Sequence, residues 1–381
     1  MRNITSSASF ADSKPHYEIL DGLRSVAALL VIWYHVFEGF ATSPVDQRFN
    51  HGYLAVDFFF VLSGFVVGYA YDDRWKRMRL GDFFKRRLIR LHPMLVMGVL
   101  LGALSFMVQG SVKWDGTPVA LSDVMLATLL GLFLIPALPG SAPEVRGNGE
   151  MFPLNGPSWS LFFEYIGNVL YALFLRRLST RWLTVWVVLT GAGLASFALF
   201  NLSGFGHLGV GWSLLDYNLP GGLLRMMFSF SVGLLMSRLF KPVHIRGAFW
   251  WCSLGVAILL CVPHLGTGGA WWHNGLYDSL CVLFAFPLLV WLGASGQTTD
   301  HASTRVCKFL GDISYPLYII HYPFMYLFYA WVWRKELSFS QAWPVATAVF
   351  LGSILLAYLC LKLYDEPVRR WLSRKFLERK P

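Results

Sequence analysis

Charged and titratable side chains occur inside apolar segments of this sequence, where their types and spacing could support acid–base chemistry or anion binding. Arg24 and His35 both lie in the first such segment, DGLRSVAALLVIWYH. The two residues are eleven positions apart. On an α-helix this spacing is three turns plus about 20°, so both side chains share one face, about 16 Å apart along the axis. A charge inside a membrane costs about 2.5 to 3.5 kcal/mol, which favours a protein-lined, hydrated interior around that face. Interfacial snorkelling is the alternative, and it suits Asp21 and Glu38 near the helix ends.

A second group of basic residues precedes the third apolar run, in the segment FFKRRLIRLHP at 83–93. Arg87 and Arg90 are three positions apart, so on a helix they project from one side. Paired guanidinium groups, with Lys85 and Arg86 nearby, can bind phosphate oxygens in bidentate fashion. The pattern predicts a site for a phosphorylated ligand, with topological anchoring or contact with anionic lipid as the alternative.

Glu164 lies in an apolar and aromatic run, within the segment NGPSWSLFFEYIGNVLY. An unpaired carboxylate is costly inside a membrane, so Glu164 is expected to have a partner, either the imidazole of His35 or an arginine. A catalytic role and a purely structural role, in which the carboxylate joins two helices, both fit this expectation.

Two further runs carry polar residues. The segment GDISYPLYIIHYPF is expected to bury Asp312 and His321, and a lone histidine in such a helix is more often a packing residue than a functional one. The segment LAVDFFFVLSGFVVGYAY contains Asp57 and the small pair Ser63 and Gly64. Small residues of this kind more often permit close helix packing than chemistry.

Composition excludes an ordinary soluble domain. The 381 residues are 55% hydrophobic and 14% charged, with a mean hydropathy of +0.50. These values are typical of a polytopic membrane protein. The polar N-terminal residues are followed by an apolar run that contains an arginine and no small-residue cleavage site, which predicts an uncleaved first span.

The net charge of +10 does not indicate nucleic-acid binding. The basic residues gather in short loops between apolar runs, where they set membrane orientation. The five cysteines lie mostly within apolar runs and lack the spacing of metal ligands. We therefore expect neither a metal site nor a disulfide framework.

Apolar runs and loop charge together predict the topology. Residues 72–93 carry eight Lys and Arg residues and the tail 365–381 carries six, so both are expected to be cytoplasmic. The runs considered as spans are 18–40, 52–71, 94–109, 121–138, 157–176, 182–201, 220–238, 247–263, 276–294, 309–332 and 342–364.

The chain between Pro93 and Pro157 must cross an odd number of times, although it contains two apolar runs, 94–109 and 121–138. One of them is therefore predicted to be re-entrant or interfacial, and the pattern does not decide which. The predicted fold is an all-α polytopic membrane protein with about ten transmembrane helices plus one re-entrant or interfacial apolar segment. The predicted organisation is a cytoplasmic N-terminal segment at 1–17, a membrane domain at 18–364 and a cytoplasmic tail at 365–381.

Five segments, in order, resemble the integral-membrane acyltransferase type 3 family: DGLRSVAALLVIWYH, AVDFFFVLSGF, KRRLIRLHP, PSWSLFFE and ISYPLYIIH. Each is weakly specific alone, but five in order are specific. The resemblance implies a ten-span fold, acyl-CoA (foremost acetyl-CoA) as the cytoplasmic donor, and O-acylation of a hydroxyl on a sugar or related acceptor. The soluble esterase-like domain of some members is not expected here, which leaves polysaccharide, lipid-linked sugar and small metabolites open as acceptors.

The resemblance also implies roles for individual residues. Acyl transfer from a thioester to a hydroxyl needs a general base, an electropositive site for the coenzyme phosphates and little water. His35, far across the bilayer, suits the base. A coenzyme bound by Arg87 and Arg90 could extend past Arg24 toward it. The expected site has catalytic His35 and Glu164, donor-binding Arg24, Arg87 and Arg90, supporting Asp21, Trp159 and His321, and no metal.

The acceptor is expected to arrive from the outer side. Outer loops 202–219 and 264–275 carry aromatic rings that could stack on sugars, or that belong to an interfacial aromatic belt. The expected partners are the lipid bilayer, acyl-CoA and a carbohydrate or glycolipid acceptor, without nucleic acid. We expect a bacterial inner-membrane protein with both termini in the cytoplasm, and the oligomeric state stays open.

Two other classes are weighed against the acyltransferase. A multi-span transporter or flippase for an anionic or sugar-containing substrate could use the same buried charges, but the sequence shows neither inverted halves nor paired broken helices. A polymerase or ligase for lipid-linked sugars would have large charged outer loops, and the outer loops here are short.

Overall fold

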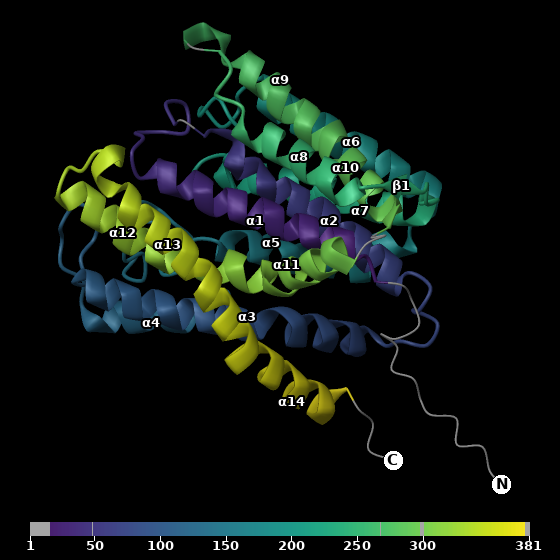
Figure 1. Cartoon of the computed structure of the whole chain (residues 1–381), viewed down its shortest axis with the longest axis horizontal. Helices are drawn as coiled ribbons and strands as arrows, with labels where there is room; N and C mark the ends of the chain where they lie inside the picture. Colours follow the sequence, from purple (N-terminus) through teal and green to yellow (C-terminus); the bar gives the residue numbers. More distant parts are fainter. Residues whose placement is uncertain (1–15, 48, 267, 298–300, 378–381) are drawn as a thin grey trace.

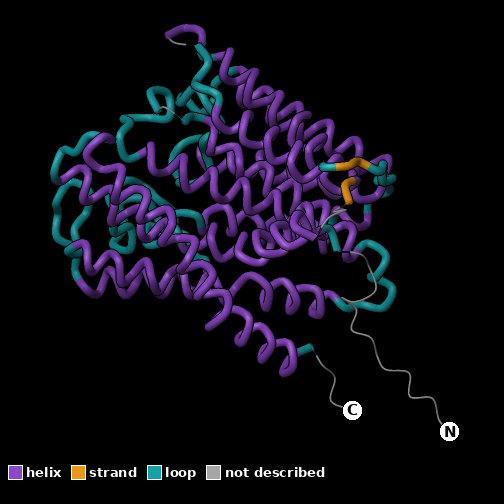
Figure 2. The backbone as a smooth tube through the Cα atoms, in the orientation of Figure 1, coloured by secondary structure: helices purple, strands orange, loops and turns teal. Residues whose placement is uncertain are grey.

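The structure, a computed structural model, is built almost entirely from helices, as the sequence predicts. Two short strands, β1 (Ile245–Arg246) and β2 (Gly296–Gln297), pair in parallel. Figure 2 shows how little of the backbone they occupy. The structure describes residues 16–47, 49–266, 268–297 and 301–377.

In the described part of the chain, eight helical segments are long and apolar enough to cross a membrane. A crossing needs about 20 residues, because the hydrocarbon core is about 30 Å thick and a helix rises about 1.5 Å per residue. Four segments are single helices: α1 (Glu18–Glu38), α3 (Leu80–Gln109), α6 (Thr180–Leu199) and α7 (Asn218–Leu239). The other four join consecutive elements: η1 (His51–Leu54) with α2 (Ala55–Tyr71), α5 (Ser158–Leu173) with η2 (Leu175–Arg177), α9 (Trp272–Leu280) with η4 (Cys281–Ala285) and α10 (Phe286–Ser295), and α13 (Phe339–Cys360) with η5 (Leu361–Asp365) and α14 (Glu366–Phe376).

The shorter helix α4 (Leu121–Leu132) packs against α3 and is not among the eight segments. A helix of this length rises about 18 Å, well short of the hydrocarbon thickness. The segments before and after α4 meet again, since the Trp114 N–H donates to the Arg146 carbonyl oxygen at 3.1 Å. Of the predicted pair, the run 94–109 belongs to a segment long enough to cross and the run 121–138 does not; that the latter is re-entrant or interfacial stays a prediction.

Two other helical regions are candidates for the remaining predicted spans. α8 (Ala248–Cys261) has 14 residues. α11 (His301–Ile320) is followed, after His321 alone, by α12 (Tyr322–Arg334). Neither region is among the eight segments that meet the criteria of length and composition. Beyond those eight, the count of about ten spans stays a prediction. The remaining short helix is η3 (Gly268–Ala270).

Helices α1 and α2 run through the middle of the bundle, with α6 and α8 to α10 on one side and α3 and α4 on the other (Figure 1). The most extensive helix contact joins α2 to α7, and it depends on two glycines. A Cβ atom at Gly64 would lie 1.9 Å from the Phe230 carbonyl oxygen, and one at Gly233 would lie 2.1 Å from the Val61 carbonyl oxygen. The prediction of close helix packing is confirmed for Gly64.

Two helices extend beyond the apolar runs that predict them. α3 begins at Leu80, where the Arg79 N–H donates to the Asp82 carboxylate at 3.3 Å, so Pro93 lies inside the helix rather than at its start. Proline is tolerated inside helices packed in a membrane bundle. At the other end of the chain, helical backbone continues through residue 364, the predicted end of the domain, to Phe376.

Short turns rich in arginine and lysine lie at one end of the bundle, which we call the basic end. Arg238 joins two of these turns, since it donates to the Asp72 carboxylate at 2.6 Å and to the Leu178 carbonyl oxygen at 2.7 Å. Figure 2 shows most of the loop backbone at the opposite end, which we call the loop end. Its longer loops are 39–47, 110–120, 133–157 and 200–217.

Candidate active site

Two neighbouring cavities lie inside the described bundle, one toward each end. The basic-end cavity has a volume of about 80 Å³ and the loop-end cavity a volume of about 400 Å³. Val56 and Tyr318 belong to the walls of both. The two cavities are therefore neighbours, with these side chains between them.

The basic-end cavity is lined by the residues that the sequence assigns to the donor. Arg87 Nη2 donates to Glu164 Oε1 at 2.6 Å, and the Ser63 hydroxyl donates to the same oxygen at 2.8 Å. The carboxylate that was expected to have a partner therefore pairs with an arginine and not with His35. The predicted site residues in this wall are Arg24, Arg87, Arg90 and Glu164.

The arginines of this cavity are incompletely neutralised. Arg24 Nη1 donates to Asp21 at 2.8 Å, and the other carboxylate oxygen of Asp21 lies 2.6 Å from His16 Nε2. Arg90 is exposed and pairs with no carboxylate among the described residues. The buried Nε of Arg87 also has no acceptor there. Guanidinium N–H groups are thus left for an anionic ligand.

His35 lies in the wall of the loop-end cavity, beside a carboxylate on its own helix. Its Nδ1 lies 2.6 Å from Glu38 Oε2, and the Tyr329 hydroxyl donates to the same oxygen at 2.8 Å. A carboxylate accepts hydrogen bonds, so it holds the proton on Nδ1 and leaves Nε2 as the basic nitrogen. Sequence analysis assigned Glu38 to the interface and missed this pair, although residues three apart share a helix face.

His321 is fully buried, and its ring stacks on that of His35 with the centroids 5.6 Å apart. Its Nδ1 donates to the carbonyl oxygens of Leu317 and Tyr318, at 3.1 and 2.8 Å. Its Nε2 has no partner in the part of the chain that the structure describes. His321 therefore adjoins the predicted base, where it packs against the imidazole.

Asp57 and Asp312 occupy different environments. Asp57 is fully buried and receives the Arg225 guanidinium, with 2.6 Å between Nη2 and Oδ2. Arg225 was not predicted as a site residue. A charge in the seventh apolar run is nevertheless as costly to insert into a membrane as the charges that were predicted to be functional. Asp312 is exposed, so the expectation that it is buried is wrong: α11 turns Ile313 and Ser314 toward the bundle and Asp312 away from it.

Trp159, predicted as a supporting residue, lies in the wall of the loop-end cavity. Its ring is 5.4 Å from the Arg225 guanidinium, close enough for a cation–π contact. Arg225 also donates to the carbonyl oxygens of Val210 and Tyr53, at 2.6 and 2.7 Å. Through these bonds α7 holds the loop 200–217 and η1 beside the cavity.

The loops at the loop end complete this cavity. The Met151 N–H donates to the Trp212 carbonyl oxygen at 2.9 Å, which joins two loops far apart in sequence. Glu150 lines the cavity and accepts from Asn148 at 2.7 Å and from the Tyr326 hydroxyl. Burial raises the pKa of the Glu150 carboxyl. Sequence analysis missed Glu150, since no local pattern marks a loop glutamate as buried.

The aromatic residues of the outer loops are divided between cavity and surface. Trp212 and Phe205 line the loop-end cavity. Tyr217 and Trp272 are 57% and 47% exposed, as residues of an interfacial belt would be.

An arginine-lined cavity beside a histidine–carboxylate pair suits the transfer of a group from an anionic donor. The sequence profile of an acyltransferase domain, that of the type 3 family, matches residues 17–362. The chain belongs to the acyltransferase type 3 family. The resemblance of the five segments is thereby confirmed, and the protein is a membrane acyltransferase.

Curated relatives of this acyltransferase cover it to different extents. The acyltransferase MdmB of Streptomyces mycarofaciens is 24% identical over 93% of this chain and 92% of its own length. A Bacillus subtilis protein, whose name proposes a peptidoglycan O-acetyltransferase, is 26% identical over 94% of this chain, which spans 56% of that protein. Protein 2 in the picA locus of Rhizobium radiobacter is 35% identical over 43% of this chain and 84% of its own length. No solved structure matches the chain significantly.

Metal chemistry has no evident place among the described residues of this acyltransferase. They contain no group of three or more His, Cys, Asp or Glu side chains placed to hold a metal ion. The five cysteines are free thiols, and four of them are buried. That catalysis proceeds without a metal stays a prediction.

Proposed function

We propose that this acyltransferase moves an acyl group, foremost acetyl, from cytoplasmic acyl-CoA to a hydroxyl of a sugar, surface polysaccharide or lipid-linked glycan. The observation that carries the proposal is the adjoining pair of cavities, one lined by arginines and the other by His35 beside Glu38. The names of several relatives, which propose O-acetyltransferases, support the reaction type.

The arginines of the basic-end cavity suit the coenzyme. A guanidinium fork can bind two phosphate oxygens at once, and the free N–H groups of Arg87 and Arg90 are placed for this contact. A cavity of about 80 Å³ is far smaller than a coenzyme A molecule. The nucleotide would therefore stay outside at the basic end, while the narrow pantetheine arm enters and passes Tyr318.

The proposed reaction uses Nε2 of His35 as the general base. This nitrogen takes the proton of the acceptor hydroxyl while the hydroxyl oxygen attacks the thioester carbonyl carbon. The carbon–sulfur bond then breaks, and the departing thiolate takes the proton from the imidazolium, which yields the ester and free coenzyme A. Glu38 keeps Nδ1 protonated and stabilises the imidazolium in between.

Glu164, predicted as catalytic, has a different role in this proposal. Its carboxylate lies in the basic-end cavity, 2.6 Å from Arg87 and in contact with Ser63. From there it would hold the Arg87 guanidinium in place, while proton transfer takes place at His35.

The basic end is proposed to face the cytoplasm of a bacterial cell. Lysine and arginine in short loops favour the cytoplasmic side of an inner membrane, and acyl-CoA is found there. Both chain termini would then also be cytoplasmic, and the loop-end cavity would open toward the periplasm or cell exterior.

The direct test is transfer by the purified protein in lipid nanodiscs, with acetyl-CoA labelled in the acetyl group and simple glycosides as acceptors. We expect the label in an ester of the glycoside. Mass spectrometry of surface glycans and lipids from cells with and without the protein should show the same acyl-sized mass difference. Labelled acetyl-CoA consumed without any ester product would contradict the proposal.

Replacement of both donor arginines by lysine, Arg87→Lys with Arg90→Lys, should weaken acyl-CoA binding at least several-fold. Lysine keeps the charge that sets topology, and at residue 87 it can still pair with Glu164, but it lacks the bidentate fork. Calorimetry on the purified variant measures the donor affinity, and acceptor affinity should change little.

The matched control replaces two exposed basic-end arginines that line neither cavity, Arg177→Lys with Arg181→Lys. This control should bind acyl-CoA as the wild type does. Donor affinity equal to wild type in the Arg87 and Arg90 variant would make those residues topological anchors and move the coenzyme site elsewhere.

A cysteine introduced at Ala142 should react with an impermeant thiol reagent added outside intact cells, and one at Arg177 should not. Both positions are exposed, and they lie at the loop end and the basic end respectively. The experiment uses a background whose own cysteines are replaced. External labelling at residue 177 would reverse the proposed orientation.

A further inference from the structure

His207 is a polar side chain of the loop-end cavity that the proposed reaction does not use. It lies in the loop between α6 and α7 and is 9% exposed. The Gly209 N–H donates to its Nδ1 at 2.9 Å, so the ring proton sits on Nε2. That Nε2 forms no hydrogen bond with any described residue. An N–H donor without a protein acceptor, on a mostly buried side chain in a cavity wall, is placed for a ligand.

The His207 imidazole is uncharged. Burial lowers the pKa of His207 to about 3, so the imidazole is neutral at physiological pH. Its ring packs beside Tyr53, with the centroids 5.2 Å apart, and stacks on Phe205 at 5.9 Å. His207 is therefore a neutral hydrogen-bond donor held between aromatic rings.

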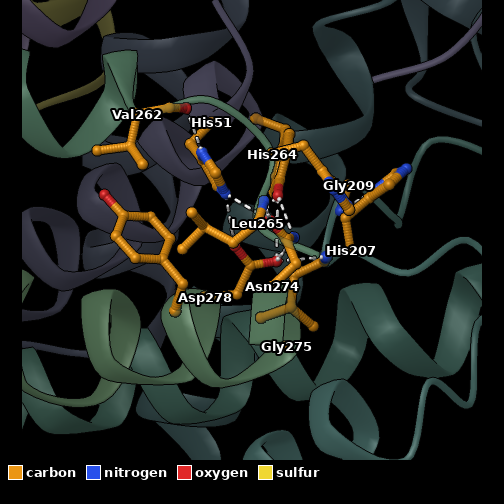
Figure 3. Close-up of polar contacts among 12 residues, drawn as sticks. His51, His207, Gly209, Val262, His264, Leu265, Asn274, Gly275 and Asp278 are labelled. Atoms are coloured by element: carbon orange, nitrogen blue, oxygen red, sulfur yellow. Dashed lines mark hydrogen bonds and ion pairs between the residues drawn. The ribbon is translucent and has the colours of Figure 1, made fainter. Parts of the chain in front are cut away.

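A buried polar cluster fixes the backbone on both sides of His207 (Figure 3). Asn274 Nδ2 donates to the Gly206 carbonyl oxygen at 3.2 Å, and the Leu208 N–H donates to Asp278 Oδ2 at 2.8 Å. Asn274 and Asp278 are themselves fully buried. The loop is thus held by groups of α9 that do not line the cavity, and the donor is preorganised.

The same cluster reaches η1. His51 Nε2 lies 2.9 Å from Asn274 Oδ1, and the Tyr53 hydroxyl donates to both carboxylate oxygens of Asp278 at 3.1 Å. Three segments distant in sequence are joined in this way, and Figure 3 shows the His51, Asn274 and Asp278 side chains meeting. This arrangement holds the position of His207 independently of the histidine's own side-chain contacts.

The loop-end cavity also contains acidic side chains. Glu38 and Glu150 line it, and Glu150 is held by neutral donors, the Asn148 amide and the Tyr326 hydroxyl. Arg225 is the one arginine or lysine among the described lining residues, and the Asp57 carboxylate already neutralises it. Fully buried Arg146 packs on the Tyr326 ring and lines neither cavity. An anionic group entering the loop-end cavity would therefore meet acidic side chains and no unpaired arginine or lysine among its described lining residues.

We propose that the loop-end cavity is an acceptor subsite selective for neutral or amine-bearing sugars, in which His207 Nε2–H and the Glu150 carboxylate bind the sugar. This inference rests on the proposed function. The volume of about 400 Å³ suits one or two sugar rings. Nε2–H donates to a hydroxyl or ring oxygen, Glu150 accepts from a hydroxyl or ammonium group, and Trp159 and Trp212 offer faces for stacking. Acidic sugars are excluded by the two carboxylates.

The wild-type protein provides the first test, with labelled acetyl-CoA and three probes: methyl β-glucoside, its 2-amino analogue and methyl β-glucuronide. Transfer to the first two should exceed transfer to the glucuronide at least tenfold in kcat/KM. If none of the three is acylated, the proposed O-acyltransferase function fails. If the glucuronide is acylated as well as the glucoside, that function stands and the charge-selective subsite is wrong.

Two substitutions at His207 test the donor. His207→Phe keeps an aromatic ring but removes the N–H, and it should raise the KM for the glucoside about tenfold while the KM for acetyl-CoA stays unchanged. His207→Gln, whose amide nitrogen can take the place of Nε2, should recover most of that loss. An unchanged acceptor KM in the phenylalanine variant, or equal increases for donor and acceptor, would overturn the assignment.

Glu150→Gln removes the negative charge and keeps one acceptor oxygen, which can still accept from the Tyr326 hydroxyl or the Asn148 amide. The preference for the amino sugar over the glucoside should fall several-fold, and transfer to the glucuronide should rise. The control, Asp216→Asn, makes the same charge change at an exposed loop-end residue whose positive φ asparagine tolerates. It should leave the preference unchanged. Equal preferences in the Glu150→Gln and wild-type proteins would contradict the proposal.

Discussion

Replacement of His35 by alanine is expected to leave a folded, membrane-inserted protein whose acyl transfer is about 10² to 10⁴-fold slower. Among the described residues that line the loop-end cavity, the imidazole of His35 is the one with a carboxylate partner on one nitrogen and the other left basic. Without it, the acceptor hydroxyl must be deprotonated by water. Donor binding should persist, because the arginines line the other cavity.

The measurement is single-turnover transfer of labelled acetyl by purified protein at saturating donor and acceptor. Glu38→Gln should have a smaller effect, because it keeps a hydrogen-bond acceptor at Nδ1 but removes the charge that stabilises the imidazolium. His244→Ala, at an exposed histidine of the basic end, is the control and should retain full activity. A well-folded His35→Ala variant with more than a tenth of wild-type transfer would remove His35 as the base.

The charges inside apolar runs were the informative part of the sequence. The insertion cost of a charge predicts that Arg24, Arg87 and Glu164 face a protein interior, and the structure places all three in one cavity wall. The same argument predicts a partner for Glu164, and the helix face shared by residues three apart could have paired Glu38 with His35. These inferences need only local spacing and the energetics of the membrane.

Contacts between segments far apart in the chain could not be predicted from local spacing. Asp57 and Arg225 are 168 positions apart, and nothing in either segment specifies the other. The backbone around His207 is fixed by Asn274 and Asp278, which come from a helix about seventy positions later in the chain. Such pairs follow from the packing of the whole bundle, which the periodicity of individual helices does not encode.

Loss of one partner of the Asp57–Arg225 pair is expected to destabilise the protein strongly. Both side chains are fully buried, with Nε and Nη2 of the arginine donating to the carboxylate. Asp57→Leu leaves a buried guanidinium without its counterion, which in other proteins costs about 3 to 5 kcal/mol. Arg225→Met leaves the carboxylate unpaired and should cost a comparable amount.

The double variant, Asp57→Leu with Arg225→Met, separates the charge from the packing. Removing both ions together avoids the unpaired charge, so its loss of thermal stability in detergent should be smaller than the sum of the two single losses. Arg370→Ala, which breaks an exposed pair with Glu366, should cost only about 0 to 1 kcal/mol and calibrates the assay. Strict additivity of the Asp57 and Arg225 changes would show that the two charges do not depend on each other.

The double variant should not regain normal acyl transfer, even though it is more stable than the sum of the single losses predicts. Arg225 also donates to the carbonyl oxygens of Val210 and Tyr53, so methionine releases the loop that carries His207 from the wall of the loop-end cavity. The KM for a glycoside acceptor should therefore stay raised while the KM for acetyl-CoA remains near wild type. A double variant with wild-type acceptor KM would mean that α9 alone holds the loop, since Asn274 and Asp278 bind the same backbone independently of Arg225.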